Sequence, residues 1–130
     1  MYERYKDVEI TDTYFTGARN VILPTLRRSV AAICRADRDV MAWYIGIASG
    51  PDHWSALTRR IDSYKLSVGI NRVYLLYQSG SEANTRRLEA DLEREFRERS
   101  HLPTLNRVGG GGGRPSGGPL YFLYLGVRRL

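Results

Sequence analysis

Cysteine and long apolar runs are what this sequence has least of. Its one cysteine, Cys34, excludes an internal disulfide and a cysteine-rich zinc site, and we expect a small buried apolar residue there. No apolar run approaches the roughly 20 residues that a membrane-spanning helix needs, so we expect no membrane association. The polar start, MYERYKDVEITD, has no apolar core of a signal peptide, which favours a cytoplasmic protein.

The charge of the chain is biased toward basic residues. Lys and Arg number 20 against 14 Asp and Glu, which gives a formal charge of +6 and a sequence pI near 9.8. Arginine predominates, and its planar guanidinium suits phosphate oxygens, so the composition favours a polyanionic partner, although charge alone discriminates weakly. At 130 residues the chain has room for one compact domain.

The first forty residues have the least regular pattern. Residues 1–17 show no clean period, and we expect an irregular arm with a short strand near Val8. Apolar residues between positions 21 and 33 recur at spacings of three and four, which indicates a helix that begins near Pro24. A second interpretation competes, because residues 30–34 can form a strand that returns as residues 40–47. We favour this hairpin.

Helical and strand patterns then alternate. Apolar residues three and four apart predict a helix over residues 54–66, and the β-branched and aromatic stretch 71–78 predicts a strand. Ser79 followed three positions later by Glu82 is typical of a capping box, which opens a charged helix that ends near residue 100. The glycine-rich stretch 109–118 predicts a loop, and the apolar residues 120–125 predict a terminal strand.

Short motifs occur in a defined order along these elements. A Tyr-Ile-Gly tripeptide at 44–46 ends a strand, and Arg60 and Tyr64 lie one turn apart on the next helix. Glu89 follows a leucine on the charged helix, where it borders the apolar stripe, and Asn106 precedes the glycines. As an ensemble, these residues resemble the GIY-YIG nucleases.

This resemblance covers residues 31–130 and implies a fold. The class is α+β, with a small, mainly antiparallel three-stranded sheet flanked by helices, followed here by the C-terminal strand. We therefore expect an N-terminal extension of residues 1–28 and a GIY-YIG-like nuclease domain of residues 29–130. The extension could serve as a homodimer contact or bind a partner protein.

The resemblance also implies a function, which is metal-dependent endonucleolytic hydrolysis of phosphodiester bonds in DNA. Glu89 would ligate Mg²⁺ or Mn²⁺, because hard cations prefer oxygen ligands. Arg60 would clamp phosphate oxygens, and Tyr44 and Tyr64 would lie at the attacking water or the phosphate. Asn106 would support the wall of the active site.

The sequence departs from the family at the first motif. The hairpin aligns Ile33 with the family's first tyrosine, which is commonly assigned to positioning or deprotonating the attacking water. Three hypotheses follow for the general base. Tyr64, His53 or a metal-bound hydroxide activates the water; or the terminal strand brings Tyr121 or Tyr124 into the vacant place; or the domain binds without cutting.

The third hypothesis amounts to an alternative function, a catalytically degenerate module that binds nucleic acid or a protein partner without cleavage. In either case, basic residues outside the catalytic set are candidates for contact with a nucleic-acid backbone. These candidates are Arg59, Lys65, Arg72, Arg107 and Arg114.

Overall fold

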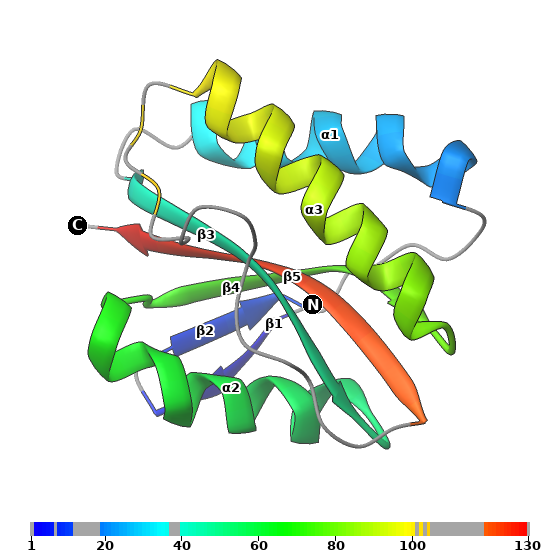
Figure 1. Ribbon diagram of the computed structural model, residues 1–130. Helices are drawn as coiled ribbons and strands as arrows, with labels where there is room; N and C mark the ends of the chain where they lie inside the picture. The colour runs from blue at the N-terminus through cyan, green and yellow to red at the C-terminus, as the bar shows by residue number, and fades with distance from the viewer. Residues whose placement is uncertain are drawn as a thin grey trace.

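The computed structural model of the chain describes residues 2–6, 8–11, 19–36, 40–100, 102, 104 and 119–129 (Figure 1). Its elements are β1 (Tyr2–Tyr5), β2 (Val8–Thr11), α1 (Arg19–Ala36), β3 (Val40–Gly50), α2 (His53–Val68), β4 (Arg72–Ser79), α3 (Glu82–Arg99) and β5 (Leu120–Arg129). The predicted α+β class is confirmed, and so is the terminal strand.

The sheet is larger than the sequence predicted. It has five strands in the order β1-β2-β4-β5-β3. The pairing of β2 with β4 is parallel and the other three pairings are antiparallel, so the sheet is mixed. The part formed by β4, β5 and β3 is antiparallel, but its middle strand is β5, which we expected to follow the three-stranded sheet. The extra strands β1 and β2 come from residues that we expected to form an extension.

The hairpin favoured for residues 30–47 is wrong. Residues 30–36 belong to the end of α1, and the strand begins only at Val40. The physical reason is the spacing of four between the buried side chains of this segment, which makes a continuous face on a helix and not on a strand. Those side chains are Ile22, Leu26, Val30 and Cys34. The alternative helix was therefore the correct interpretation, although it begins at Arg19, before Pro24.

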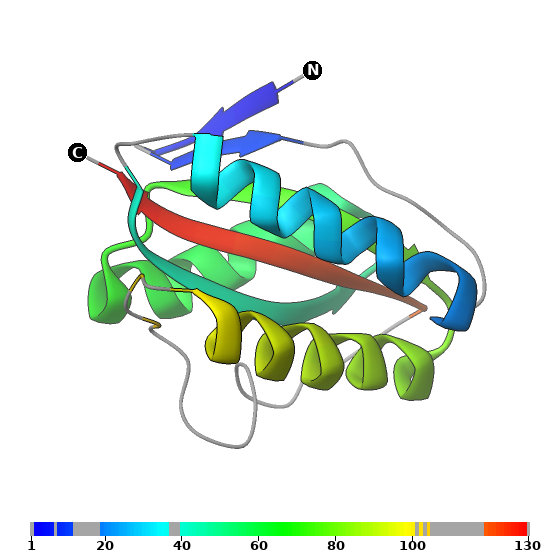
Figure 2. The ribbon, with the colours of Figure 1, turned by 90° about the horizontal axis from the view of Figure 1, so that it is seen from above.

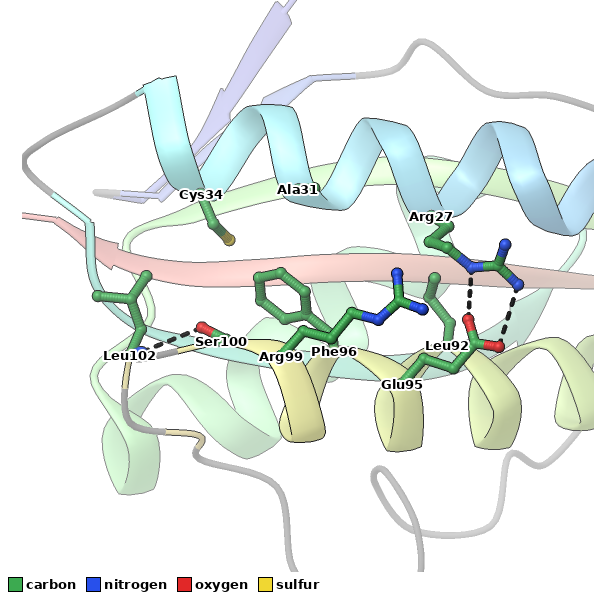
Figure 3. Close-up of a pocket in the computed structure, with 9 residues that line it drawn as sticks. All are labelled: Arg27, Ala31, Cys34, Leu92, Glu95, Phe96, Arg99, Ser100 and Leu102. Carbon is green, nitrogen blue, oxygen red and sulfur yellow. Dashed lines mark hydrogen bonds and ion pairs between the residues drawn. The ribbon is translucent and has the colours of Figure 1, made fainter.

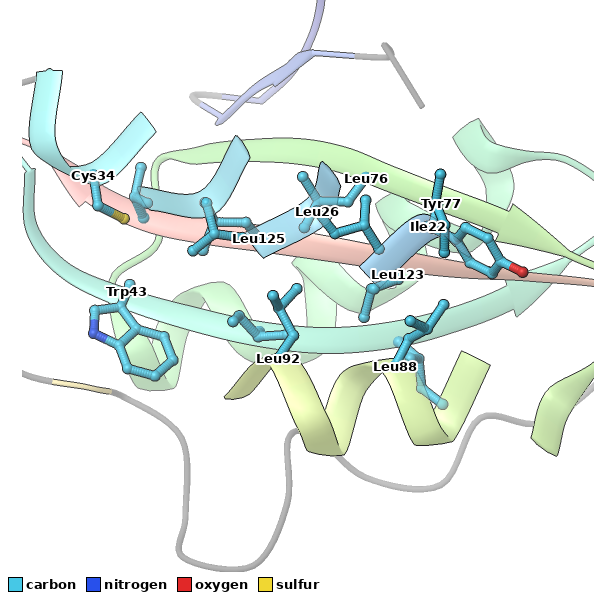
Figure 4. Close-up of a cluster of buried hydrophobic side chains, with 14 of the residues drawn as sticks. Ile22, Leu26, Cys34, Trp43, Leu76, Tyr77, Leu88, Leu92, Leu123 and Leu125 are labelled. Atoms are coloured by element: carbon cyan, nitrogen blue, oxygen red, sulfur yellow. The ribbon is translucent and has the colours of Figure 1, made fainter. Parts of the chain in front are cut away.

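Helices cover both faces of the sheet. Helices α1 and α3 pack against each other over one face, and α2 covers the other face (Figures 1 and 2). Alternate residues of β3 point into the two cores. Trp43 joins the core under α1 and α3 (Figure 4). Ile45 and Ile47 belong to the same core, whereas Tyr44 and Ala48 belong to the core that α2 covers.

Side chains cap the helices that flank the candidate site. The Asp52 carboxylate accepts a hydrogen bond from the Ser55 amide at 2.8 Å at the start of α2. The N-cap of α3 is Ser81, whose hydroxyl oxygen accepts from the Asn84 amide at 3.1 Å. The predicted capping box of Ser79 and Glu82 is wrong, because the N-cap is Ser81, two residues later, and the Ser79 hydroxyl accepts a hydrogen bond from the Ser81 amide.

Candidate active site at the edge of β3

Tyr44 and Tyr124 lie together on neighbouring strands, on the face of the sheet that α2 covers. Gly46 pairs with Tyr124 of β5 in the antiparallel register, and the rings of Tyr44 and Tyr124 lie 6.0 Å apart. A Cβ atom on Gly46 would lie 2.7 Å from a ring carbon of Tyr44 and 2.8 Å from the Tyr124 hydroxyl oxygen. Glycine is therefore required at position 46 for the Tyr124 hydroxyl to lie against β3.

Arg60 is held beside the same strand. It lies on α2 and is partly buried, and its Nε donates a hydrogen bond to the carbonyl oxygen of Ile47 at 3.0 Å. Because β3 is the last strand of the sheet, its outer carbonyl groups are open to a side chain that reaches around from a helix. This hydrogen bond fixes the guanidinium at the edge of β3.

Glu89 lies on the other side of the sheet. It lies on α3 and is only 6% exposed, and its Oε2 has no hydrogen-bond partner in the described part of the chain. The pKa of Glu89 is raised from 4.5 to about 7. Burial is the main cause and the charge of Glu93 adds to it, whereas the positive charges of Arg86 and Arg60 act in the opposite direction. The site thus holds a carboxyl group that titrates near neutral pH.

The charges of Arg60 and Glu89 interact although their helices lie on opposite faces. Helix α2 carries Arg60 beneath the sheet and α3 carries Glu89 above it (Figure 1). The edge strand β3 separates the two helices, and the hydrogen bond to Ile47 places Arg60 at that edge. The charge of Arg60 nevertheless acts to lower the pKa of Glu89, so the arginine and the buried carboxyl group that the sequence motifs had singled out lie within electrostatic range of each other.

Two further charged residues belong to this site and were not predicted. Glu93 is one turn beyond Glu89, is 4% exposed, and accepts a hydrogen bond from Arg97 Nε at 2.7 Å. Arg86, one turn before Glu89, is partly buried and forms an ion pair with Glu82 at 2.9 Å. The signal that could have found both is their helical spacing of three and four from Glu89.

Other candidates lie elsewhere. His53 Nε2 is 3.1 Å from a carboxylate oxygen of Glu3, so it connects α2 to β1. Arg72 forms an ion pair with Glu9 on the neighbouring strand β2. Ile33 packs from α1 against the core and is not in the sheet, so it cannot stand in for a tyrosine on the strand next to Tyr44.

Part of the predicted set is not described. Arg59 is exposed on α2. Tyr64 and Lys65 belong to α2, but their side chains lie outside the described part of the structure, as do Asn106, Arg107 and Arg114 altogether. Tyr121 is partly buried near the start of β5 and pairs with Ser49.

Two negative findings apply to the described residues. They contain no group of three or more His, Cys, Asp or Glu side chains arranged to hold a metal ion. Their helices also include none that is long and apolar enough to cross a membrane.

Comparison with known proteins adds no relative, because no family model, no curated protein and no solved structure matches this chain.

Proposed function

We propose that the protein is a metal-dependent endonuclease that hydrolyses phosphodiester bonds in DNA at the edge of β3. The observation that carries this proposal is the pairing of a fixed arginine, Arg60, with the buried and incompletely hydrogen-bonded carboxyl group of Glu89. Arginine binds phosphate oxygens and offsets the charge that develops on them. The basic charge of the chain is consistent with a DNA substrate.

The proposed metal ligand is Glu89. Its Oε2 is a buried oxygen without a hydrogen-bond partner among the described residues, which is the kind of atom that Mg²⁺ or Mn²⁺ binds. The neighbouring carboxylate of Glu93 already accepts from Arg97. The described residues therefore fit an ion that keeps most of its water and takes one carboxylate, an arrangement common for Mg²⁺. Such an ion would supply an activated water and charge neutralisation.

The tyrosines would act as positioning residues. Tyr44 and Tyr124 are each 3% exposed, so neither is placed to touch a large substrate directly. Their contact supports the second hypothesis for the missing first tyrosine, in which the terminal strand supplies Tyr124 beside Tyr44. In this proposal Tyr124 orients the strand residues next to Arg60, and the attacking water would be activated by the chemistry that the metal ion supplies.

The second candidate is a binding module that does not cleave. It is favoured by the helical position of Ile33 and by the lack of a multi-carboxylate group among the described residues. This candidate predicts DNA binding that weakens steeply with salt and no cleavage with any metal.

The test compares wild type, Glu89→Gln and Glu98→Gln on supercoiled and branched DNA, with Mg²⁺, with Mn²⁺ and with a chelator. Glu98 is exposed on the same helix, so its variant is a matched control for loss of one carboxylate. We expect wild type and Glu98→Gln to cleave with metal only, and Glu89→Gln to lose cleavage while it remains folded by circular dichroism. Salt-sensitive binding without cleavage in all three proteins would favour the binding module.

A further inference from the structure

A pocket of about 430 Å³ opens between α1 and α3, on the face of the sheet opposite α2 (Figure 3). Its apolar lining comes from both helices and from the residue that follows α3. These lining residues are Ala31, Cys34, Leu92, Phe96 and Leu102. The volume lies near the lower end of the roughly 300 to 1,000 Å³ that small-molecule pockets occupy, so the pocket suits a small ligand with an apolar body.

The charged groups of this pocket differ in whether they have an ion-pair partner. Arg27 donates two hydrogen bonds to the Glu95 carboxylate, at 2.6 and 3.0 Å, so these two charges neutralise each other. Arg99 also lines the pocket from an exposed position at the end of α3, and in Figure 3 its side chain runs alongside that helix past Phe96. Among the described residues Arg99 has no ion pair or hydrogen bond, so the pocket carries one uncompensated positive charge.

Ser100, the residue that follows Arg99, contributes a hydroxyl group to the lining of the pocket. Ser100 Oγ accepts a hydrogen bond from the Leu102 amide at 3.0 Å, and a hydroxyl that accepts in this way can still donate its own hydrogen. The pocket therefore combines an apolar lining with one cation and one available O–H donor. Because the charges of Arg27 and Glu95 offset each other, a ligand with a single carboxylate matches the one remaining charge of the pocket, on Arg99.

We propose that this pocket binds a small organic monocarboxylate with an aliphatic body, such as a medium-chain fatty acid. The aliphatic chain lies against Leu92 and Phe96, and the carboxylate pairs with Arg99. The pocket shares no lining residue with the candidate active site, so this proposal stands apart from the proposed nuclease function.

Titration calorimetry with octanoate and with octanol tests the role of charge. We expect octanoate to bind wild type, and Arg99→Gln to weaken octanoate binding by about two- to fivefold, because the lost ion pair involves an exposed arginine. Octanol binding should be equal in wild type and Arg99→Gln. The control is Arg87→Gln, which removes the same charge from an exposed position of the same helix and should leave octanoate binding unchanged.

The single cysteine reports occupancy of the pocket. Because Cys34 is the chain's one thiol and lines the pocket, its alkylation by neutral iodoacetamide can be assigned without ambiguity. Octanoate should slow alkylation of wild type in proportion to its calorimetric saturation. Ala31→Leu, which fills the pocket from α1, should abolish octanoate binding while the fold remains intact by circular dichroism.

Three results would overturn the proposal. The first is the absence of octanoate binding to folded wild type. The second is binding that Ala31→Leu and Arg99→Gln both leave unchanged, because the ligand would then lie elsewhere. The third is a wild-type dimer in sedimentation that Ala31→Leu dissociates without any octanoate binding, which would assign the pocket to a second copy of the chain.

Discussion

At the scale of single residues, Glu89 makes the stability of the protein depend on pH. Its pKa is raised from 4.5 to about 7, so between these values the folded protein keeps a proton that the unfolded chain has released. The free energy of unfolding therefore falls as pH rises through this window, by about 3 kcal/mol. We expect Glu89→Gln to remove this fall. The free energy of unfolding of the variant minus that of wild type should therefore increase from pH 4.5 to pH 8.

Urea unfolding in the presence of a chelator measures this difference. Glu98→Gln serves as the control, because Glu98 is exposed on the same helix and its substitution should leave the pH profile of wild type unchanged. A stability difference between wild type and Glu89→Gln that stays constant from pH 4.5 to pH 8 would contradict the raised pKa.

Binding of a divalent ion to Glu89 should appear in stability as well as in cleavage. A ligand that binds only the folded state raises the melting temperature, and Glu89 must be deprotonated to bind a cation. We expect millimolar Mg²⁺ to raise the melting temperature of wild type at pH 8 and to have much less effect at pH 6. Equal shifts in wild type and Glu89→Gln, measured by calorimetry, would show that the ion binds elsewhere.

Gly46 carries a steric requirement that can be measured. Gly46→Ala would bring its Cβ within 2.8 Å of the Tyr124 hydroxyl oxygen and 2.7 Å of a Tyr44 ring carbon, and these buried rings have little room to move. We expect a loss of about 1 to 3 kcal/mol in denaturant unfolding, partly restored by Tyr124→Phe. Gly80→Ala is the control, because a Cβ there meets nothing within 4 Å. No rescue by Tyr124→Phe would argue against the contact.

The residues of the candidate site differ in how far the sequence could predict them. Arg60 and Glu89 were predicted from the resemblance of the motif order to the GIY-YIG nucleases, because helical position alone does not distinguish Glu89 from the other acidic residues of α3. Tyr124 remained one of several hypotheses, because its position beside Tyr44 depends on which strand pairs with β3. Strand pairing is a long-range property that periodicity does not encode.

At the scale of elements, the start of α3 depends on Ser81. Its hydroxyl oxygen accepts from the Asn84 amide at 3.1 Å, so Ser81→Ala should cost about 1 kcal/mol in denaturant unfolding. Ser81→Asp should retain most of the stability, because a carboxylate also accepts this bond and favours the helix N-terminus. If Ser81→Asp destabilises as much as Ser81→Ala, the cap does not explain the loss.

Helix α1 shows why a short apolar run is hard to interpret. Residues 30–34 contain valine, isoleucine and cysteine in sequence, which suits a buried strand as well as a buried helix turn. The deciding information was the spacing of four that extends back to Ile22, over a window longer than any one strand. In contrast, the apolar pattern of α2, β4, α3 and β5 fits either a helix or a strand but not both. The first three were predicted near their observed bounds, and β5 begins as predicted but extends to Arg129.

At the scale of the whole molecule, the order of strands was beyond prediction from the sequence. The last strand, β5, lies between β3 and β4, and β2 joins the sheet in parallel to β4 across some sixty residues. The short strand expected near Val8 is confirmed as β2, but the sequence did not predict that the side chains of Val8 and Ile10 are fully buried. Their burial depends on partners that the local sequence does not reveal.

The N-terminal strands should therefore contribute to the stability of the whole sheet. Beyond the buried side chains of β2, the Tyr5 hydroxyl and the Lys6 ammonium donate to the Asp62 carboxylate of α2 at 3.0 and 2.7 Å. Deletion of residues 1–11 would expose the apolar surface that Val8 and Ile10 cover, and we expect a loss of about 3 to 6 kcal/mol in denaturant unfolding.

Lys6→Ala separates this burial from the surface ion pair. Because the Lys6–Asp62 pair is exposed to solvent, its removal should change stability very little. A shortened chain of residues 12–130 that unfolds at the same denaturant concentration as the full chain would mean that β1 and β2 are the extension that the sequence suggested. A chain of residues 29–130 goes further, because it cuts α1 and removes Ile22 and Leu26 from the core, so we expect it not to fold.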